Sequence, residues 1–193
     1  MADFRKVTIE DKQWIRDRIS SRKLPTCEYT FGNIFSYSNL LDVKVADYNG
    51  FLLTKDFDND YTTYCFPVGS GDIEQALKCI VDDGIRTGNN FLLFGLNAED
   101  ADTLQKLFPG KFEIELTRDR FDYIYAEEDL RTLKGRKYQA KRNHISYFMK
   151  NNNWSYEKIT DENVHLCYEM SKKWLEMSES EYKSDLEDEL DII

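Results

Sequence analysis

The dipeptide Asn49-Gly50 constrains the fold most, because it separates two runs that are typical of β-strands, 43–48 and 51–55. Both central positions of a two-residue hairpin turn require a positive φ, which asparagine and glycine adopt at low cost. An acidic turn at 56–60 is followed by another β-type run at 61–67. The sequence therefore predicts a meander of three antiparallel strands.

Helices are predicted on both sides of this meander. Apolar spacing and capping residues indicate helices at 8–19, 30–41, 72–84, 97–109, 136–150 and 160–175, and a short helix or turn at 127–133. Further strands are expected at 90–95, 112–116, 121–125 and 154–159. The first of these is wholly apolar, which is typical of the buried centre of a sheet. This order predicts an α+β fold, with helices on both faces of a mixed, largely antiparallel sheet.

Composition limits the class of protein. The chain has 193 residues with 41% hydrophobic side chains, enough for a substantial core. Its net charge of −10 disfavours binding of nucleic acid or anionic membranes by the whole surface, so such binding would have to be local. No signal peptide or membrane-spanning run is recognisable, and we expect a cytoplasmic protein without a transmembrane segment.

The sequence contains no familiar catalytic or metal motif. Cysteines at positions 27, 65, 79 and 167 and histidines at 144 and 165 lack metal-ligand spacing, so no metal site is predicted. We expect the four cysteines to be reduced and mostly buried. No catalytic triad, P-loop or dinucleotide fingerprint is present, so the catalytic residues are unknown.

A basic segment stands out in this acidic chain, because six of the twelve residues at 131–142 are lysine or arginine. Lys137, Lys141 and His144 share one stripe of the predicted helix. One interpretation is a site for an anionic partner, in which His144 could exchange a proton near neutral pH. The other is internal neutralisation by the protein's own carboxylates. The candidate ligand-binding residues of the segment are Lys134, Arg136, Lys137, Lys141, Arg142 and His144.

Two further places are candidates for ligand binding. Gly69 and Gly71 lie in a strand-to-helix turn whose backbone N–H groups could hold an anion, although a tight turn capped by Asp72 is the alternative. Tyr123 and Tyr125 share one face of a predicted strand. They could line a site for a polar ligand, or they could simply pack in the sheet.

Three motifs together resemble an uncharacterised bacterial family. It is similar to the C-terminal domain of phosphatidylglycerol lysyltransferases and, more distantly, to Fem-type aminoacyltransferases. The motifs are Phe66-Pro67-x-Gly69-x-Gly71-Asp72, Asp122-Tyr123-Ile124-Tyr125 and Leu130-x-x-Leu133-Lys134-Gly135-Arg136-Lys137-Tyr138-x-x-Lys141-Arg142-Asn143-His144. The resemblance implies a GCN5-related N-acyltransferase-like fold, usually with two lobes in tandem. It places a first lobe at 1–135, and a linking helix and the beginning of a second, incomplete lobe at 136–193.

The resemblance also implies an activity. Lysyltransferases of this kind move an aminoacyl group from charged tRNA to a lipid, and simpler acyltransferases hold the diphosphate of acyl-CoA on the loop that matches Gly69 and Gly71. We therefore expect an acyl- or aminoacyltransferase-like protein with an anionic donor, aminoacyl-tRNA or acyl-CoA. The alternative is a non-catalytic binding or scaffold module with a degenerate fold. The incomplete second lobe also suggests self-association.

Overall fold

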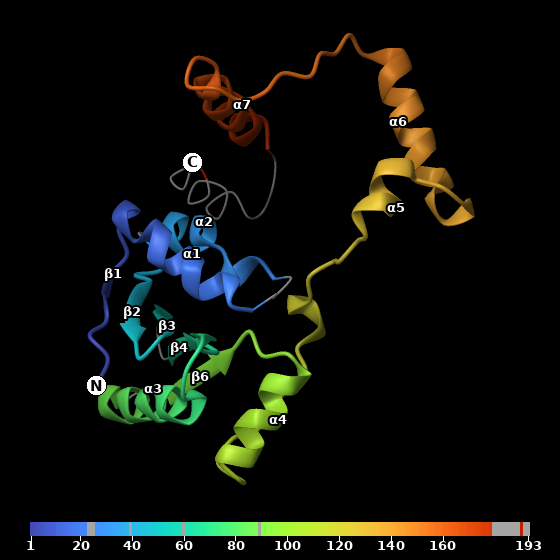
Figure 1. Ribbon diagram of the computed structural model, residues 1–193. Coiled ribbons are helices and arrows are strands. Elements are labelled where there is room, and N and C mark those ends of the chain that lie inside the picture. Colours follow the sequence, from blue (N-terminus) through green and yellow to red (C-terminus); the bar gives the residue numbers. More distant parts are fainter. Residues whose placement is uncertain (23–25, 39, 59–60, 89, 179–189, 191–193) are drawn as a thin grey trace. The chain divides into compact units, whose positions relative to one another are not determined.

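The computed structural model describes residues 1–193 except 23–25, 39, 59–60, 89, 179–189 and 191–193 (Figure 1). The chain forms two compact units, one spanning Met1–Arg120 and the other Phe121–Leu190. The division of the chain into lobes at 1–135 and 136–193 remains a prediction.

The first unit is built on one mixed sheet. Its strands follow the order β1-β2-β3-β4-β6, and β5 pairs with β3. Only β4 and β6 run parallel among the described pairs, and the other pairs are antiparallel. The strands are β1 (Arg5–Lys6), β2 (Lys44–Tyr48), β3 (Phe51–Asp58), β4 (Tyr61–Cys65), β5 (Val68–Gly69) and β6 (Asn90–Phe94).

The predicted hairpin joins β2 to β3. Asn49 and Gly50 have φ of 48° and 90°, as a two-residue hairpin turn requires. The turn sets the register in which Tyr48 faces Phe51 and Lys44 faces Lys55. Because side chains alternate along a strand, this register sends Leu52 to one face of the sheet and Leu53 to the other.

Helices cover both faces of this sheet. Figure 1 shows α1 and α2 on one side of the strands and α3 on the other. Leu52 packs with Ile15 of α1 on the first face, whereas Leu53 packs with Ile80 of α3 on the second. The predicted α+β class is confirmed. The helices are α1 (Lys12–Ser20), α2 (Phe31–Ser36), α3 (Ile73–Thr87) and α4 (Ala98–Leu107), with 3₁₀ turns η1 (Ile9–Asp11), η2 (Cys27–Tyr29) and η3 (Arg118–Arg120).

Three predicted boundaries or positions in this unit are wrong. Helix α2 ends at Ser36 instead of reaching residue 41. Helix α3 continues past Gly84, whose missing side chain makes room for Phe91: a Cβ there would lie 2.6 Å from the ring. The helix instead ends before Gly88. Strand β6 follows β4 at the end of the described strand order, not at its centre, and Leu92 is 48% exposed.

The alternating segments 112–116, 121–125 and 154–159 were expected to be strands, but none forms one in the described structure. Alternation predicts a strand only where a neighbouring strand can pair with it. No described strand pairs with these segments, and most of their side chains are exposed, although Phe112 packs against the core of the first unit. Leu116, Tyr123 and Tyr156 retain 80%, 87% and 89% of their accessible surface.

The second unit is mainly helical. It contains α5 (Glu127–Thr132), η4 (Arg136–Tyr138), α6 (Gln139–Asn151) and α7 (Val164–Met177). The predicted helices at 127–133, 136–150 and 160–175 are thus confirmed, with the second beginning as a 3₁₀ turn. On α7, Tyr168 and Trp174 are exposed at 44% and 56%, whereas Cys167, Ser171 and Leu175 are half-buried. Among the described residues, no helix is both long and apolar enough to cross a membrane.

The cysteines differ in burial. Cys79 is buried, Cys65 and Cys167 are half-buried and Cys27 is exposed, so the expectation of mostly buried thiols is wrong for Cys27. Cys65 lies on β4, where burial raises the pKa of its thiol to about 12.

Candidate anion-binding site

The turn between α5 and α6 carries the basic segment. Leu133 and Gly135 both have positive φ, 47° and 91°, which reverses the chain after α5. The guanidinium of Arg142, from α6, donates hydrogen bonds to the carbonyl oxygens of Leu133 and Gly135. Arg142 therefore holds the turn in place, and this predicted ligand residue has its N–H groups directed at the protein's own backbone.

A second set of contacts fixes the start of α6. Tyr138 is buried at 6% exposure and donates its hydroxyl proton to Asp129 Oδ2 across 3.1 Å. Lys137 Nζ lies 3.0 Å from the same oxygen and 4.7 Å from the centre of the Tyr138 ring. Hydrogen bonds from Lys137 and Tyr138 hold the pKa of Asp129 below its usual range. The charge of Lys137 is therefore neutralised within the protein, by the carboxylate of Asp129 on α5.

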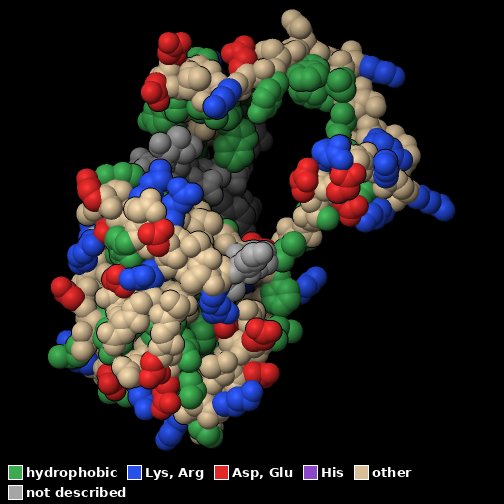
Figure 2. Space-filling model, in the orientation of Figure 1, with side chains coloured by type: hydrophobic (Ala, Val, Ile, Leu, Met, Phe, Trp, Pro, Cys, Tyr) green, Lys and Arg blue, Asp and Glu red, His purple; other side chains and the backbone are tan. Residues whose placement is uncertain are grey.

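Three cations of the segment have no such partner among the described residues. Lys134, Arg136 and Lys141 are exposed, and none forms an ion pair with a carboxylate in the described part of the chain. Figure 2 shows Lys and Arg side chains gathered with Asp and Glu over α5 and the start of α6. Arg131, in contrast, pairs with Glu127 and Glu128. The segment therefore offers three cations to a ligand after its internal pairs are satisfied.

The two predicted tyrosines are exposed beside this turn. Tyr125 retains 45% of its surface, and Lys141 Nζ lies 5.8 Å from the centre of its ring. Tyr123 lies two residues earlier on the same segment, which has no helix or strand, and retains 87% of its surface. Within the described residues neither side chain packs in a sheet.

His144 lies on α6 one turn after Lys141, and its side chain is exposed. The predicted stripe of Lys137, Lys141 and His144 begins only at Lys141, because Lys137 belongs to the 3₁₀ turn η4. No hydrogen bond or ion pair with another described residue orients the imidazole.

The predicted glycines lie in the first unit, where both approach the β2–β3 hairpin turn. A Cβ on Gly69 would lie 2.1 Å from the Gly50 carbonyl oxygen, and one on Gly71 would lie 2.7 Å from that of Asn49. Asp72 caps α3, and its carboxylate accepts a hydrogen bond from the Gln75 backbone N–H. The expected capped turn is therefore present, with a carboxylate at the helix N-terminus.

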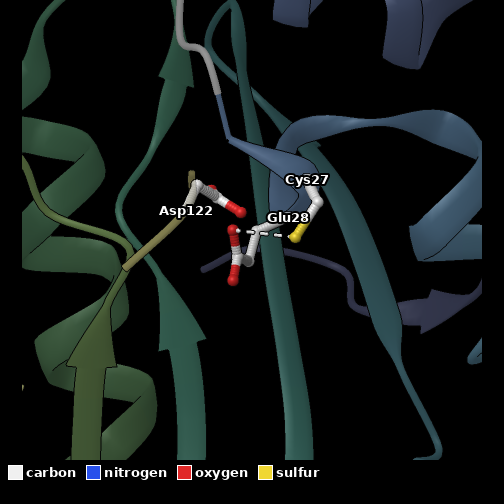
Figure 3. Close-up of side chains that lie close together, drawn as sticks. All are labelled: Cys27, Glu28 and Asp122. Atoms are coloured by element: carbon white, nitrogen blue, oxygen red, sulfur yellow. Dashed lines mark hydrogen bonds between the residues drawn. The ribbon is translucent and has the colours of Figure 1, made fainter. Parts of the chain in front are cut away.

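The exposed thiol of Cys27 has an acidic neighbour on η2. Figure 3 shows the Cys27 sulfur directed at the Glu28 carboxylate, and the sulfur lies 3.6 Å from Oε2. Thr26 hydrogen bonds to the same oxygen. Asp122, drawn in the same view, belongs to the second unit. Within the first unit these groups do not make a set of three metal ligands.

The structural role of Tyr138 and Asp129 was missed by sequence reasoning. An acidic residue in the first turn of α5 looks like an ordinary helix-capping charge. Nothing in the sequence indicated that Asp129 contacts Tyr138, nine residues later. The two side chains meet because the chain turns at Leu133 and Gly135.

The structure combines an α+β unit, which has helices on both faces of a mixed sheet, with a helical unit that carries a cationic turn, and the α+β unit is consistent with an acyltransferase-like fold. A family model described as phosphatidylglycerol lysyltransferase, C-terminal, matches residues 21–190. The chain belongs to this family.

One solved structure is similar along the whole chain. It is described as a conserved protein of unknown function from Bacteroides thetaiotaomicron VPI-5482, with 28% sequence identity and a TM-score of 0.92. The match covers 100% of this chain and 65% of that chain, so the present sequence spans about two thirds of the neighbour. No curated protein matches.

Proposed function

We propose that this protein acts in aminoacyl transfer and that its cationic turn binds the anionic donor, an aminoacyl-tRNA. One observation carries the proposal: Lys134, Arg136 and Lys141 are exposed and lack carboxylate partners in the described residues, in a chain with a net charge of −10. Phosphate groups are the natural ligands of such local cations. Family membership supports a transferase relationship.

The first unit supports tRNA over acyl-CoA as the donor. A diphosphate on the loop of Gly69 and Gly71 would need free backbone N–H groups at the start of α3. Asp72 already accepts a hydrogen bond from that helix end, and its negative charge repels phosphate. Both glycines are also explained by their close approach to the hairpin turn.

The proposal includes a GCN5-related fold with two lobes and a cytoplasmic location. In such a reaction an amine attacks the activated ester of the donor, and positioning of the two reactants supplies much of the acceleration. No nucleophilic side chain is required, and the proposal assigns none.

Calorimetric titration with charged tRNA, uncharged tRNA and acyl-CoA tests the proposal. We expect saturable binding of tRNA and weaker binding after the triple substitution Lys134→Ala, Arg136→Ala and Lys141→Ala. The matched control replaces Lys12, Lys106 and Lys111, which are also exposed but lie in the first unit. Absence of saturable tRNA binding, or equal losses in both triple variants, would contradict the proposal.

A non-catalytic binding module is the second candidate. It is favoured by Phe66 and Asp72. In acyltransferases of the type that this chain resembles, the acyl-CoA loop typically begins with glutamine or arginine, where this chain has Phe66, and Asp72 puts a negative charge at the position of the phosphate. This candidate predicts tRNA binding without transfer of a labelled aminoacyl group to any amine or lipid acceptor. Detection of the labelled aminoacyl group on an amine or lipid acceptor would exclude this candidate.

Self-association is a further part of the proposal. Side chains on α6 and α7 remain exposed, including Phe148 at 51% and Trp174 at 56%. Such apolar surfaces often mark contacts between proteins. Light scattering across a concentration series measures this directly, and a constant monomeric mass would contradict it.

A further inference from the structure

An exposed aromatic ring, that of Tyr125, lies beside Lys141, a cation of the basic segment that has no carboxylate partner among the described residues. Tyr123 and Tyr125 precede α5 on a segment without helix or strand, and both side chains are exposed, at 87% and 45%. The ammonium group of Lys141, from the first turn of α6, reaches the Tyr125 ring at 5.8 Å. This contact joins the aromatic segment to the cationic turn within one compact unit.

We propose that this combination is a binding site for single-stranded nucleic acid, in which Tyr123 and Tyr125 stack on bases and the cations contact the backbone. This inference rests on the proposed function and narrows it. The part of a charged tRNA that would bind here is its unpaired 3′ end, which carries the aminoacyl ester.

The number of cations favours a single strand over a duplex. Proteins that track duplex DNA or RNA by charge alone neutralise many phosphates, and affinity rises with each one. Among the basic residues at 131–142, only Lys134, Arg136 and Lys141 lack an ion-pair or hydrogen-bond partner in the described structure. Three contacts in an otherwise acidic chain give weak, salt-sensitive binding, so a second source of affinity is needed.

Base stacking supplies that second source. Each base stacked on an aromatic ring strengthens binding by about 5- to 150-fold, and every base has a face that can stack. Bases in a duplex are already stacked and are not available to Tyr123 or Tyr125. A lysine next to the ring adds attraction for the phosphate that follows the stacked base.

The test measures binding of a fluorescein-labelled RNA of about eight nucleotides, as a single strand and as a duplex, by anisotropy. We expect the single strand to bind at least about fivefold more tightly than the duplex. Tyr125→Leu and Tyr123→Leu should each weaken single-strand binding by about fivefold or more. Tyr125→Phe and Tyr123→Phe keep the ring and should retain binding.

Three results would overturn this inference: equal binding of single strand and duplex, equal affinities of the Leu and Phe variants, or unchanged RNA binding with loss of binding to phosphatidylglycerol vesicles in the Leu variants. The last result would assign the rings to a membrane surface. The proposed function is judged separately. If the Lys134, Arg136 and Lys141 triple variant loses tRNA binding while the Leu variants do not, tRNA binding stands and base stacking fails.

Discussion

The ammonium group of Lys55 lies 2.6 Å from Asp83 Oδ2, and both side chains are more than nine-tenths buried. Lys55 comes from β3 and Asp83 from α3, so the pair joins the sheet to the helix on one of its faces. Tyr64 donates a hydrogen bond to the same carboxylate oxygen at 2.7 Å, and Arg86 contacts the other oxygen. The ammonium nitrogen of Lys55 also lies 4.2 Å from the centre of the Phe4 ring.

Removal of one partner of this pair should destabilise the first unit strongly. Asp83→Leu leaves a buried ammonium group without its carboxylate, and we expect a loss of about 3–5 kcal/mol in the free energy of unfolding. Lys55→Met should cost less, because Tyr64 and Arg86 still contact the carboxylate. Urea denaturation measures both. The double variant should be more stable than Asp83→Leu alone, and strictly additive losses would contradict the account.

The loss of folding stability at acidic pH should depend on Asp11. Two hydrogen bonds from Arg5 and one of 2.7 Å from Trp14 Nε1 hold the pKa of this buried carboxyl well below its usual range. A depressed folded-state pKa gives stability that is fully present above the unfolded value of about 3.9 and is lost as the pH falls below it.

Asp11→Asn should therefore flatten the decline in stability below about pH 4. The measurement is the urea midpoint at several pH values. Asp102→Asn, at an exposed position, is the control for loss of one negative charge. Equal acid sensitivity of wild type and Asp11→Asn would contradict the role of Arg5 and Trp14.

The end of α3 should depend on Gly88. This residue has φ of 74°, and a Cβ added to it would meet nothing within 4 Å, so a substitution there is disfavoured by backbone conformation and not by a clash. Gly88→Ala should cost about 1–2 kcal/mol. Gly32→Ala is the matched control, because Gly32 lies inside α2 with equal space and no positive φ, and alanine should be neutral or stabilising there. Similar effects at both positions, measured by thermal denaturation, would contradict this account.

The cysteines should differ in reactivity. Cys27 is exposed, whereas burial raises the pKa of the Cys65 thiol to about 12 and keeps it protonated. Because the thiolate is the reactive form, iodoacetamide should modify Cys27 in the native protein and Cys65 only after unfolding. Peptide mass spectrometry identifies the modified position. Equal labelling of the two residues under native conditions would show that Cys65 is not shielded.

Local signals predicted the first unit well. Asn49 and Gly50 specified the hairpin because the turn conformation depends on those two residues alone. Asp72 and Asn97 cap α3 and α4 as expected, since a cap is formed within one helical turn. The predicted end of α3 failed at Gly84, where the absence of a side chain serves packing against Phe91 and has no effect on the local backbone preference.

Features that depend on partners were not predictable. The apolar sequence of β6 suggested a central strand, but position in a sheet depends on which strands pair, and Leu92 is half exposed. In the candidate site, charge density singled out the basic segment at 131–142. It could not separate Lys137, which pairs with Asp129, from Lys141, which does not pair with a carboxylate among the described residues. That difference arises from the turn at Leu133 and Gly135.

The salt dependence of tRNA binding tests the central claim most directly. The claim is that Lys134, Arg136 and Lys141 contact the phosphates of the donor. Each contact contributes about 0.7 to the slope of log affinity against log salt for an unpaired strand, so the triple alanine variant should have a slope shallower than wild type by about 2. The Lys12, Lys106 and Lys111 variant should keep the wild-type slope. Identical slopes for wild type and the first variant would contradict the account.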